Sequence, residues 1–330
     1  MRVLVTGGSG FIGSYLVERL LDRGDEVFVV DNLSTGRLDN LSAVRHHSDL
    51  HLNVDTILNH PMMDETVAKC DQVIHLAAAV GVRKIMERPV ETITTNVRGT
   101  EIILDCCHRH GVPLFLASTS EIYGKAGKSL HEEQDRVMGS STHRRWAYAC
   151  TKMLDEFLAL AYHHERGLPV IIARFFNTVG PRQAGQWGMV LPNFIASAIR
   201  GDPIQVFGTG EQLRSFCHVQ DTIRAVEGLV ACDEAWGQVF NIGHEDEITI
   251  RGLAERVKEL AGSGSKIELV SYEEAYGEGF EDMERRQPDT TRIRELIAWV
   301  PENDLDAIIR STVDHMRAQA AESAGAKEIR

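Results

Sequence analysis

Two short stretches of the sequence carry residue types that could handle protons together. Tyr148 and Lys152 are four residues apart, so on a helix their side chains lie on one face and can share a pocket. The stretch STSEIYG supplies hydroxyl groups at Thr119 and Ser120 and a carboxylate at Glu121. A phenol, an ammonium, a hydroxyl and a carboxylate in one place would support general acid–base chemistry. We therefore treat these five as candidate catalytic residues.

The elements that would position them are predicted by the hydrophobic pattern of the first half of the chain. Short apolar runs bounded by turn residues indicate buried strands, and amphipathic segments between them indicate helices. This alternation predicts an α/β fold, a Rossmann-type doubly wound parallel sheet with a smaller C-terminal substrate-binding lobe. The predicted strands are 2–5, 26–30, 72–76, 114–117 and 170–175, and the predicted helices are 11–23, 64–69, 89–110 and 147–166.

The character of the chain changes at about Asn177, where Gly, Pro and Gln become frequent and the strands become short. This change predicts a smaller lobe at one edge of the sheet, with a helix over 219–231 returning to the first domain. We expect a dinucleotide-binding domain over 1–176 together with 218–242, and a substrate lobe over 177–217 and 243–317. The Ala-rich, polar segment 318–330 is expected to fray.

A glycine-rich turn follows the first predicted strand. Gly7, Gly10 and Gly13 give the spacing GxxGxxG between a strand and a helix. Glycines permit a tight turn and close backbone approach, and the helix N-terminus receives a pyrophosphate. Asp31 ends the second strand at the spacing expected for an acid that binds the adenosine ribose and repels a 2′-phosphate. NAD is therefore favoured, although Arg37 raises the NADP alternative.

Composition limits the other classes of protein. The formal net charge of −13 argues against a nucleic-acid surface. The six cysteines form no CxxC pair, the chain opens into a strand without a signal peptide, and no apolar run reaches membrane-span length. We expect a cytoplasmic protein with no membrane association. The fourteen histidines show no zinc-ligand spacing, so we expect no metal.

The motifs taken in order resemble the extended short-chain dehydrogenase/reductase family, specifically its nucleotide-sugar epimerases, dehydratases and decarboxylases. The matching stretches are TGGSGFIG, DNLSTG, HLAA at 75–78, YACTK at 148–152, FNTVGPR at 176–182 and RQPD at 286–289. They span nearly the whole chain. The resemblance implies that Tyr148 takes a proton from a sugar hydroxyl while NAD takes the hydride. Lys152 would favour the phenolate and hold the nicotinamide ribose, and Thr119 would bind the reacting hydroxyl.

The same resemblance implies a set of binding residues. Asp55 is a candidate adenine contact, with a surface turn as the alternative. The expected cofactor contacts are Gly7, Gly10, Phe11, Ile12, Gly13, Asp31, Asn32, Thr35, Gly36, Asp55, Leu76, Ala77, Ala78, Asn96, Tyr148 and Lys152. The expected substrate contacts are Arg83, Asn177, Val190, Gln205, Phe207, Arg214 and Arg286, with the two arginines of the second lobe on the diphosphate.

Three features favour one branch of this family. Ser120-Glu121 after Thr119 resembles the UDP-glucuronate decarboxylases and the GDP-mannose 4,6-dehydratases. QLRSF around Arg214 resembles the decarboxylases, and RWAY at 145–148 resembles the bacterial decarboxylase that acts on UDP-glucuronate. Such an enzyme, a UDP-xylose synthase, converts UDP-glucuronic acid through a UDP-4-keto-hexuronic acid to a UDP-4-keto-pentose or UDP-xylose.

Other readings stay open. The GVR at 81–83 resembles UDP-glucuronate 4-epimerases, and Arg83 could grip the substrate carboxylate in either enzyme. A UDP-hexose or UDP-hexuronate 4-epimerase is therefore the alternative, and a nucleotide-sugar 4,6-dehydratase the third. A binding module that has lost catalysis is disfavoured by the intact Tyr148 and Lys152. The predicted helices 89–110 and 147–166 resemble those that form a homodimer interface in this family.

Overall fold

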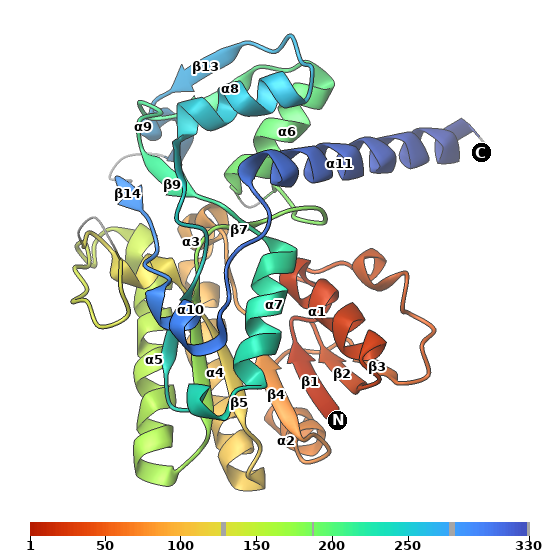
Figure 1. Ribbon diagram of the computed structural model, residues 1–330, viewed down its shortest axis with the longest axis vertical. Coiled ribbons are helices and arrows are strands. Elements are labelled where there is room, and N and C mark those ends of the chain that lie inside the picture. The colour runs from red at the N-terminus through yellow and green to blue at the C-terminus, as the bar shows by residue number, and fades with distance from the viewer. Residues whose placement is uncertain (127–129, 187, 277–280, 329–330) are drawn as a thin grey trace.

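The computed structural model describes residues 1–126, 130–186, 188–276 and 281–328. A seven-stranded sheet forms the first domain, and all of its strands are parallel, in the order β11-β6-β5-β4-β1-β2-β3 (Figure 1). The predicted Rossmann-type fold is confirmed. Its strands are β1 (Arg2–Thr6), β2 (Glu26–Val30), β3 (Leu50–Asn53), β4 (Gln72–His75), β5 (Leu114–Thr119), β6 (Val170–Phe175) and β11 (Val239–Ile242).

Alternate residues of the central strands face opposite helical layers. Val3 and Val5 pack with α1 (Phe11–Asp22) and α7 (Val219–Val230), whereas Leu4 between them packs with the other layer. That other layer holds α2 (His60–Val67), α4 (Pro89–His110) and α5 (Ala147–Arg166). Both faces of the sheet are therefore buried, which is why its strands are nearly continuous apolar runs.

Helices α4 and α5 have ordinary start and stop signals. Pro89 lies in the first turn of α4, where its missing N–H costs no hydrogen bond. Gly111 and Gly167 end α4 and α5 in the left-handed conformation, with φ of 66° and 69°. The sequence predicted both helices with their observed bounds. It did not predict β3, which has only four residues and alternates between half-buried and exposed positions.

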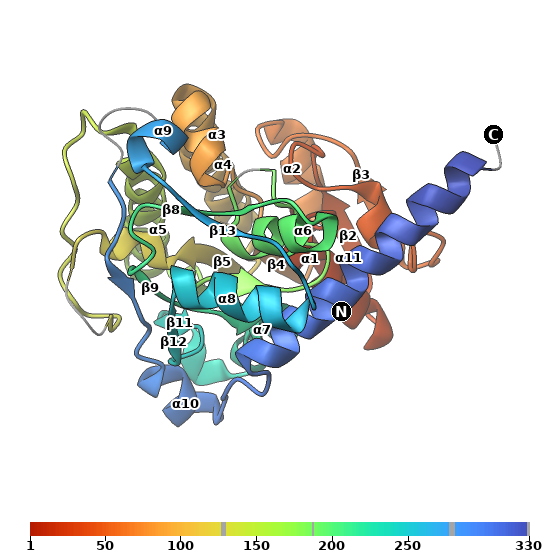
Figure 2. The same ribbon diagram turned by 90° about the horizontal axis from the view of Figure 1, so that it is seen from above.

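A second, smaller lobe lies beyond the carboxyl ends of these strands, at the top of Figure 1, and lies in front of them in the view from above (Figure 2). Its core is built by α6 (Val190–Arg200), β8 (Ile204–Phe207), α8 (Ile250–Leu260) and α11 (Leu305–Glu328), with Leu191, Leu253 and Ile308 completely buried. The remaining elements are α3 (Val82–Glu87), β7 (Thr178–Val179), β9 (Leu213–Ser215), β10 (Cys217–His218), β12 (Glu247–Thr249), β13 (Ile267–Val270), α9 (Tyr272–Tyr276), β14 (Arg285–Arg286) and α10 (Thr291–Ile297), with 3-10 turns η1 (Leu38–Leu41), η2 (Ser120–Tyr123), η3 (Arg144–Trp146) and η4 (Asp233–Ala235).

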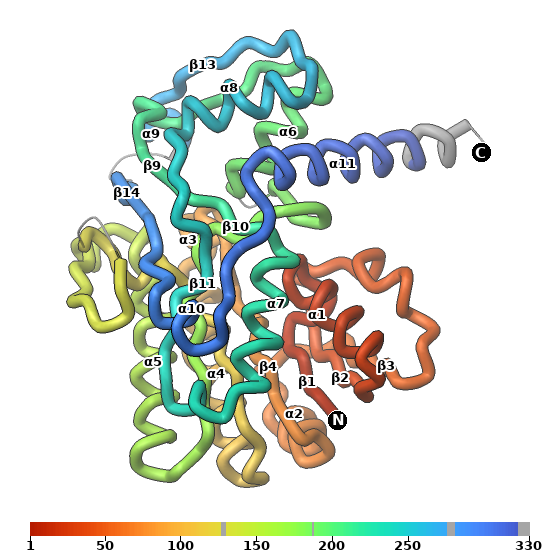
Figure 3. The backbone as a smooth tube through the Cα atoms, viewed as in Figure 1, coloured from red at the N-terminus to blue at the C-terminus, as the bar shows by residue number. Residues whose placement is uncertain are grey.

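The chain crosses between the two parts more often than the sequence indicated. After β14 it descends to α10 beside the first domain and then rises again to α11 (Figure 3). Ile293 of α10 and Trp299 belong to the same core as Val219 and Ile223 of α7. The sequence placed all of 243–317 in the second lobe. The structure differs because these two apolar side chains are buried against the sheet domain.

The segment 318–330, which the sequence predicted to fray, is helical in the structure as far as Glu328, within α11. Four of the seven residues from Ala318 to Ala324 are alanine, and alanine is the strongest helix former. This local propensity extends a helix whose first turns are anchored by Ile308, Ile309 and Val313 in the core of the second lobe.

Candidate functional site

A cavity of about 700 Å³ runs between the sheet domain and the second lobe. It begins at the glycine-rich turn after β1, passes the ends of β4 and β5, and reaches α6 and β8. Ligands of open α/β sheets bind at this edge, where the strands present their carboxyl ends.

The turn after β1 is packed too closely for side chains. Gly7 has φ of 73°, and a Cβ atom there would lie 2.9 Å from the backbone nitrogen of Ala77. A Cβ atom at Gly13 would lie 2.2 Å from the carbonyl oxygen of Gly7. These contacts bring the N-terminus of α1 against the end of the sheet, so that its free N–H groups face the cavity wall.

Asp31 lies at the cavity wall at the end of β2. Its carboxylate accepts hydrogen bonds from the backbone N–H groups of Ser9 at 3.0 Å and Leu33 at 2.8 Å. Burial raises the pKa of Asp31, and these backbone hydrogen bonds oppose that effect. The turn therefore fixes the carboxylate in place and leaves it facing the cavity, as recognition of ribose hydroxyls requires.

Tyr148 lies in the first turn of α5 and lines the same cavity. Thr119 ends β5, and its side-chain oxygen accepts a hydrogen bond from the Glu121 N–H at 3.2 Å. Burial raises the pKa of Tyr148, the charge of Glu121 raises it further, and a hydrogen bond with Thr119 lowers it. The sequence prediction that a strand end would bring Thr119 and Glu121 to Tyr148 agrees with this geometry.

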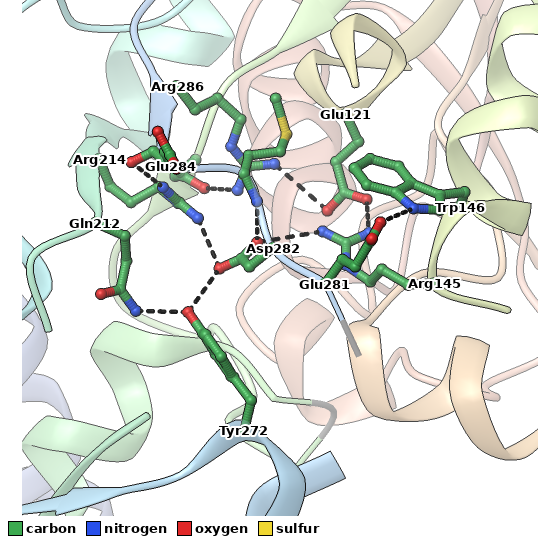
Figure 4. Close-up of polar contacts among 12 residues, drawn as sticks. Glu121, Arg145, Trp146, Gln212, Arg214, Tyr272, Glu281, Asp282, Glu284 and Arg286 are labelled. Atoms are coloured by element: carbon green, nitrogen blue, oxygen red, sulfur yellow. Dashed lines mark hydrogen bonds and ion pairs between the residues drawn. The ribbon is translucent and has the colours of Figure 1, made fainter. Parts of the chain in front are cut away.

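Glu121 is held by two arginines that come from distant parts of the chain (Figure 4). Arg145 lies 2.5 Å from one carboxylate oxygen, and Arg286 lies 3.4 Å from the other. Burial raises the pKa of Glu121, but the two guanidinium groups outweigh burial and lower it below the ordinary value. Glu121 is consequently a carboxylate at neutral pH although it is almost fully enclosed.

The two arginines continue into a larger charged cluster at the second lobe (Figure 4). Asp282 lies 2.7 Å from Arg214 and 3.8 Å from Arg145. Arg286 also donates to the side-chain oxygen of Asn177 at 2.7 Å. Three guanidinium groups face two carboxylates, so the cluster retains one positive charge, which favours an anionic ligand.

Within this cluster, the positive charge of Arg286 is disfavoured by its surroundings. Burial lowers its pKa to about 10, and the like charges of Arg214 and Arg145 act in the same direction. Its Nε is buried and has no hydrogen-bond partner among the residues that the structure describes. A ligand anion would supply that missing acceptor.

Most of the residues selected from the sequence line this one cavity. They are Gly7, Gly10, Phe11, Ile12, Gly13, Asp31, Asn32, Thr35, Asp55, Leu76, Ala77, Ala78, Thr119, Ser120, Glu121, Tyr148, Asn177, Val190, Gln205, Phe207, Arg214 and Arg286. The structure thus brings together segments that are up to 279 positions apart, from Gly7 to Arg286.

Three predicted cofactor residues lie behind the wall instead. Lys152 is buried and lies 3.0 Å from Asp155. Asn96 is also buried, where its side chain accepts from the Ala79 N–H at 2.8 Å and donates to Thr151 at 3.2 Å. Gly36 packs against Asp31, and a Cβ atom there would lie 2.9 Å from its carboxylate. These positions support the wall rather than line it.

Arg83 is the predicted substrate residue that the structure places elsewhere. Its side chain is 66% exposed and pairs with Glu87 at 3.0 Å on the outer side of α3. The next residue, Lys84, lines the cavity, is 3% exposed and lies 3.2 Å from Glu91. The sequence motif identified the right helix, but the helical phase turns Lys84 inward, which a motif three residues long does not reveal.

Sequence reasoning gave no role to Arg145, Asp282 or Lys84. Arg145 had one available signal, since it precedes Tyr148 by three residues and therefore lies one turn away from it. Asp282 had no signal, because it meets Arg145 from 137 positions further along the chain. Gln212 and Tyr272, which hydrogen-bond at 2.8 Å beside Asp282, were likewise not identified.

Two further classes of site were sought. Among the described residues, no group of three or more His, Cys, Asp or Glu side chains is arranged to hold a metal ion. Within the same parts of the chain, no helix combines the length and apolarity that crossing a membrane requires.

The fold and the site define the class of protein. The sequence model described as GDP-mannose 4,6 dehydratase matches residues 4–312. The chain belongs to this family, which confirms the resemblance to the extended short-chain dehydrogenases/reductases.

Two relatives with matching sequences are both named as decarboxylases. The chain is 39% identical over 322 residues to a UDP-N-acetyl-alpha-D-glucosaminuronate decarboxylase from Bacillus cytotoxicus, covering 96% of this chain and 98% of that protein. It is 34% identical over 330 residues to UDP-glucuronic acid decarboxylase 1 of Xenopus tropicalis, covering 99% of this chain and 75% of that one.

Solved structures of this fold include enzymes with other names. A UDP-glucose 4-epimerase from Thermotoga maritima, with UDP-glucose, has a TM-score of 0.86 at 29% identity and covers 97% of this chain and 100% of its own. A dTDP-glucose 4,6-dehydratase from Streptomyces venezuelae, with NAD and TYD bound, has a TM-score of 0.88 at 28% identity, covering 97% and 98%.

Proposed function

We propose that this chain is an NAD-dependent decarboxylase of a UDP-hexuronic acid. UDP-glucuronic acid is the proposed substrate, and the products are carbon dioxide with UDP-4-keto-pentose, UDP-xylose or both. Both curated relatives described above are decarboxylases of UDP-uronic acids. The observation that carries the proposal is Glu121, held ionised between Arg145 and Arg286 beside Tyr148.

The residues at one end of the cavity fit NAD. The turn Gly7–Gly13 and the N-terminus of α1 would hold the pyrophosphate, and Asp31 would bind the adenosine ribose. When bound, NAD accepts a hydride from the sugar and can return it. The exposed Arg37 at the same wall already lies 3.5 Å from Asp39, so it offers little against the repulsion of a 2′-phosphate by Asp31.

Tyr148 and Thr119 would act on the C4 hydroxyl of the sugar. Thr119 binds that hydroxyl and Tyr148 removes its proton, giving a 4-keto uronic acid. Because the ketone lies β to the carboxylate, it accepts the electrons that are released when carbon dioxide leaves. Tyr148 and Thr119 then donate hydrogen bonds to the enolate oxygen, a form of electrostatic stabilisation that is prepared before the reaction.

Glu121, Ser120 and the arginines would act at C5 and at the charged groups of the substrate. Arg286 and Arg214 suit the diphosphate, and the net positive charge of their cluster favours a second anion, the uronate carboxylate. Ser120 and Glu121 would manage protons and water near C5. A 4-epimerase needs no carboxylate there, so the enclosed Glu121 favours decarboxylation over that alternative.

The decisive experiment offers the purified protein UDP-glucuronic acid and follows carbon dioxide and the nucleotide-sugar products by mass spectrometry. We expect loss of one carbon dioxide. Appearance of UDP-galacturonic acid instead would establish the 4-epimerase. Loss of water from UDP-glucose, offered in a separate reaction, would establish the dehydratase. A parallel reaction uses UDP-N-acetylglucosaminuronic acid, because one curated relative is named for that substrate.

A matched pair of tyrosine variants tests the role of the site within that assay. Tyr148→Phe removes the proposed base and should abolish oxidation of the sugar. Tyr162→Phe lies on the same helix, where its ring packs against Arg166, and should leave the rate unchanged. Full activity of Tyr148→Phe would show that the hydroxyl of Tyr148 is not the base.

We also infer a homodimer in the cytoplasm. Val90 and Ile93 of α4 and Leu154 and Phe157 of α5 are exposed apolar side chains on two packed helices. A second copy would cover this surface in the four-helix arrangement that the resemblance implies. All six cysteines are free thiols, which suits a reducing compartment. Light scattering of the native protein and of Phe157→Glu tests the assembly, and an unchanged mass would contradict it.

A further inference from the structure

Helix α5 carries two consecutive buried acids, Asp155 and Glu156, one turn beyond Lys152. Only Glu156 has partners that explain its place in the fold. Glu156 accepts a hydrogen bond from Ser118 at 2.5 Å and three from the guanidinium of Arg174. Asp155 is 1% exposed, and the charged group beside it is the ammonium of Lys152 at 3.0 Å. Glu156 therefore stabilises the fold, whereas Asp155 is directed at a candidate catalytic residue.

The surroundings of Asp155 contain few charges. From α4, Thr100 lies close enough for its hydroxyl to lower the pKa of Asp155, and this hydroxyl lies 3.4 Å from Nε2 of His75 on β4. Burial together with Lys152 lowers the pKa of His75 to about 3, so His75 is neutral. Burial raises the pKa of Asp155, with a further contribution from Glu156, while Lys152 and Thr100 lower it.

The charges that face Tyr148 come from its own helix and from two other elements. Glu121 of η2 and Asp155 of α5 both raise the pKa of Tyr148 beyond the effect of burial, and Arg286 of β14 lowers it. Arg145 of η3 acts on Glu121 directly, because it lies 2.5 Å from that carboxylate. Asp155 thus opposes the ionisation that a catalytic tyrosine needs, although it touches Lys152 rather than the substrate cavity.

We propose that Asp155 is a positioning residue for Lys152: its carboxylate binds the ammonium and limits how much of that positive charge reaches Tyr148. The pair is formed within one helix, at i and i+3, so its geometry is fixed by α5 itself. Asp155 therefore makes ionisation of Tyr148 less favourable than it would be beside an unpaired Lys152. The proposal rests on the proposed function only in taking Tyr148 as the base.

The test measures ionisation of Tyr148 without any sugar substrate. Tyrosinate absorbance is followed against pH in the NAD-saturated protein, and the same titration of the matching Tyr148→Phe protein is subtracted. We expect Asp155→Asn to hold about tenfold more phenolate at a given pH than the native protein, a shift of about one pH unit. Circular dichroism defines the pH range in which each protein stays folded.

A second background tests whether the effect of Asp155 on Tyr148 requires Lys152. In Lys152→Met, the buried Asp155 has lost its cation and would be protonated, so adding Asp155→Asn should change the Tyr148 titration little. Equal shifts in the native and Lys152→Met backgrounds would overturn the proposal. So would an unchanged titration, or a shift to higher pH, in Asp155→Asn alone.

Two further variants complete the test, one as an independent change beside Asp155 and one as a control. Thr100→Val removes the hydroxyl that favours the Asp155 carboxylate, and it should move the titration in the same direction as Asp155→Asn by a smaller amount. This variant tests the proposal even if Asp155→Asn fails to fold. Glu165→Gln alters an exposed acid near the end of the same helix and should have no effect. Because no uronic acid is used, failure of the decarboxylation assay and failure of this proposal are distinguishable.

Discussion

The two ends of the cavity each hold a buried acid, and they hold it by opposite means. Asp31 is fixed by backbone N–H groups from its own turn and from the glycine-rich turn, and burial raises its pKa. Glu121 is fixed by the side chains of Arg145 and Arg286, and these lower its pKa although it is deeply enclosed.

The difference follows from what each end recognises. Dipoles of backbone N–H groups orient Asp31 without neutralising it, which suits an acceptor for hydroxyl groups that must also repel a phosphate. Full charges compensate Glu121 and leave a net positive cluster, which suits an anionic sugar nucleotide. The part of the cavity that only binds a ligand can use the partial charges of backbone N–H groups. The part where a negative charge develops during the reaction needs the full charges of ionised side chains.

Removal of the Glu121 charge should have the largest effect of the variants that test this contrast. In Glu121→Gln we expect carbon dioxide release to fall by about 10²–10⁴-fold. The first hydride transfer, followed by NADH absorbance in a single turnover, should fall less, because Tyr148 and Thr119 remain. Equal loss of both steps would contradict a role for Glu121 after oxidation.

Removal of one arginine should cost stability as well as activity. Arg145→Met leaves Glu121 enclosed with only Arg286 at 3.4 Å, so the free energy of unfolding should fall by about 3 kcal/mol. Urea denaturation measures this change. Arg144→Met is the control, since the neighbouring Arg144 is exposed and should contribute within about 0.5 kcal/mol. Similar losses in both variants would show that the Glu121 pair is not the cause.

At the other end of the cavity, Asp31→Asn should weaken NAD binding and leave the turnover number unchanged. Loss of charged hydrogen bonds to the ribose should weaken NAD binding by about 10–100-fold, and the preference over NADP should shrink. Calorimetric titration with both dinucleotides measures this effect. The turnover number at saturating NAD should stay close to the native value, and a large fall would mean that Asp31 influences more than binding.

The two acids should give opposite pH dependences of stability in the cofactor-free protein. Since the folded-state pKa of Glu121 is lowered, its pairing stabilises the fold above the ordinary carboxyl range, and this contribution disappears as pH falls through the lowered pKa. Since the pKa of Asp31 is raised, its ionisation costs stability as pH rises through the raised value.

Denaturation at several pH values between about 3 and 7 compares the two variants with the native protein. The acid-side loss of stability should become smaller in Glu121→Gln and larger in Asp31→Asn, because each variant lacks one of these opposing contributions. Identical pH profiles in the two variants would contradict the contrast.

The smallest effect is expected on α3. Arg83→Ala should change the Michaelis constant for the sugar nucleotide less than about twofold, because its exposed ion pair with Glu87 contributes little. Lys84→Met, which removes the inward cation, should raise that constant more. Steady-state kinetics with both variants measures this, and a larger effect of Arg83→Ala would restore the prediction made from the GVR motif.

Much of the first domain could be predicted because its signals are local. Continuous apolar runs gave five strands of the sheet, and Gly7, Gly10, Gly13 and Asp31 were identified from spacing alone. The short edge strands β3 and β11 were both missed. Half-exposed residues leave no apolar run in β3, and β11 has only four residues with the polar Asn241 among them. The return of α10 to the first core was missed as well, because Ile293 shows its burial only in the folded chain.

The sequence by itself determined the parallel sheet, the dinucleotide turn and the candidate pair Tyr148 and Lys152, because each depends on spacing within one or two elements. Only the tertiary structure decided the electrostatics. Arg145 and Arg286 meet Glu121, and Asp282 meets Arg145, from segments far apart in the chain, while the packing of α3 turned Lys84 inward. The charge state of a buried group depends on distances of a few ångströms to such neighbours, and those distances exist only after the elements have packed.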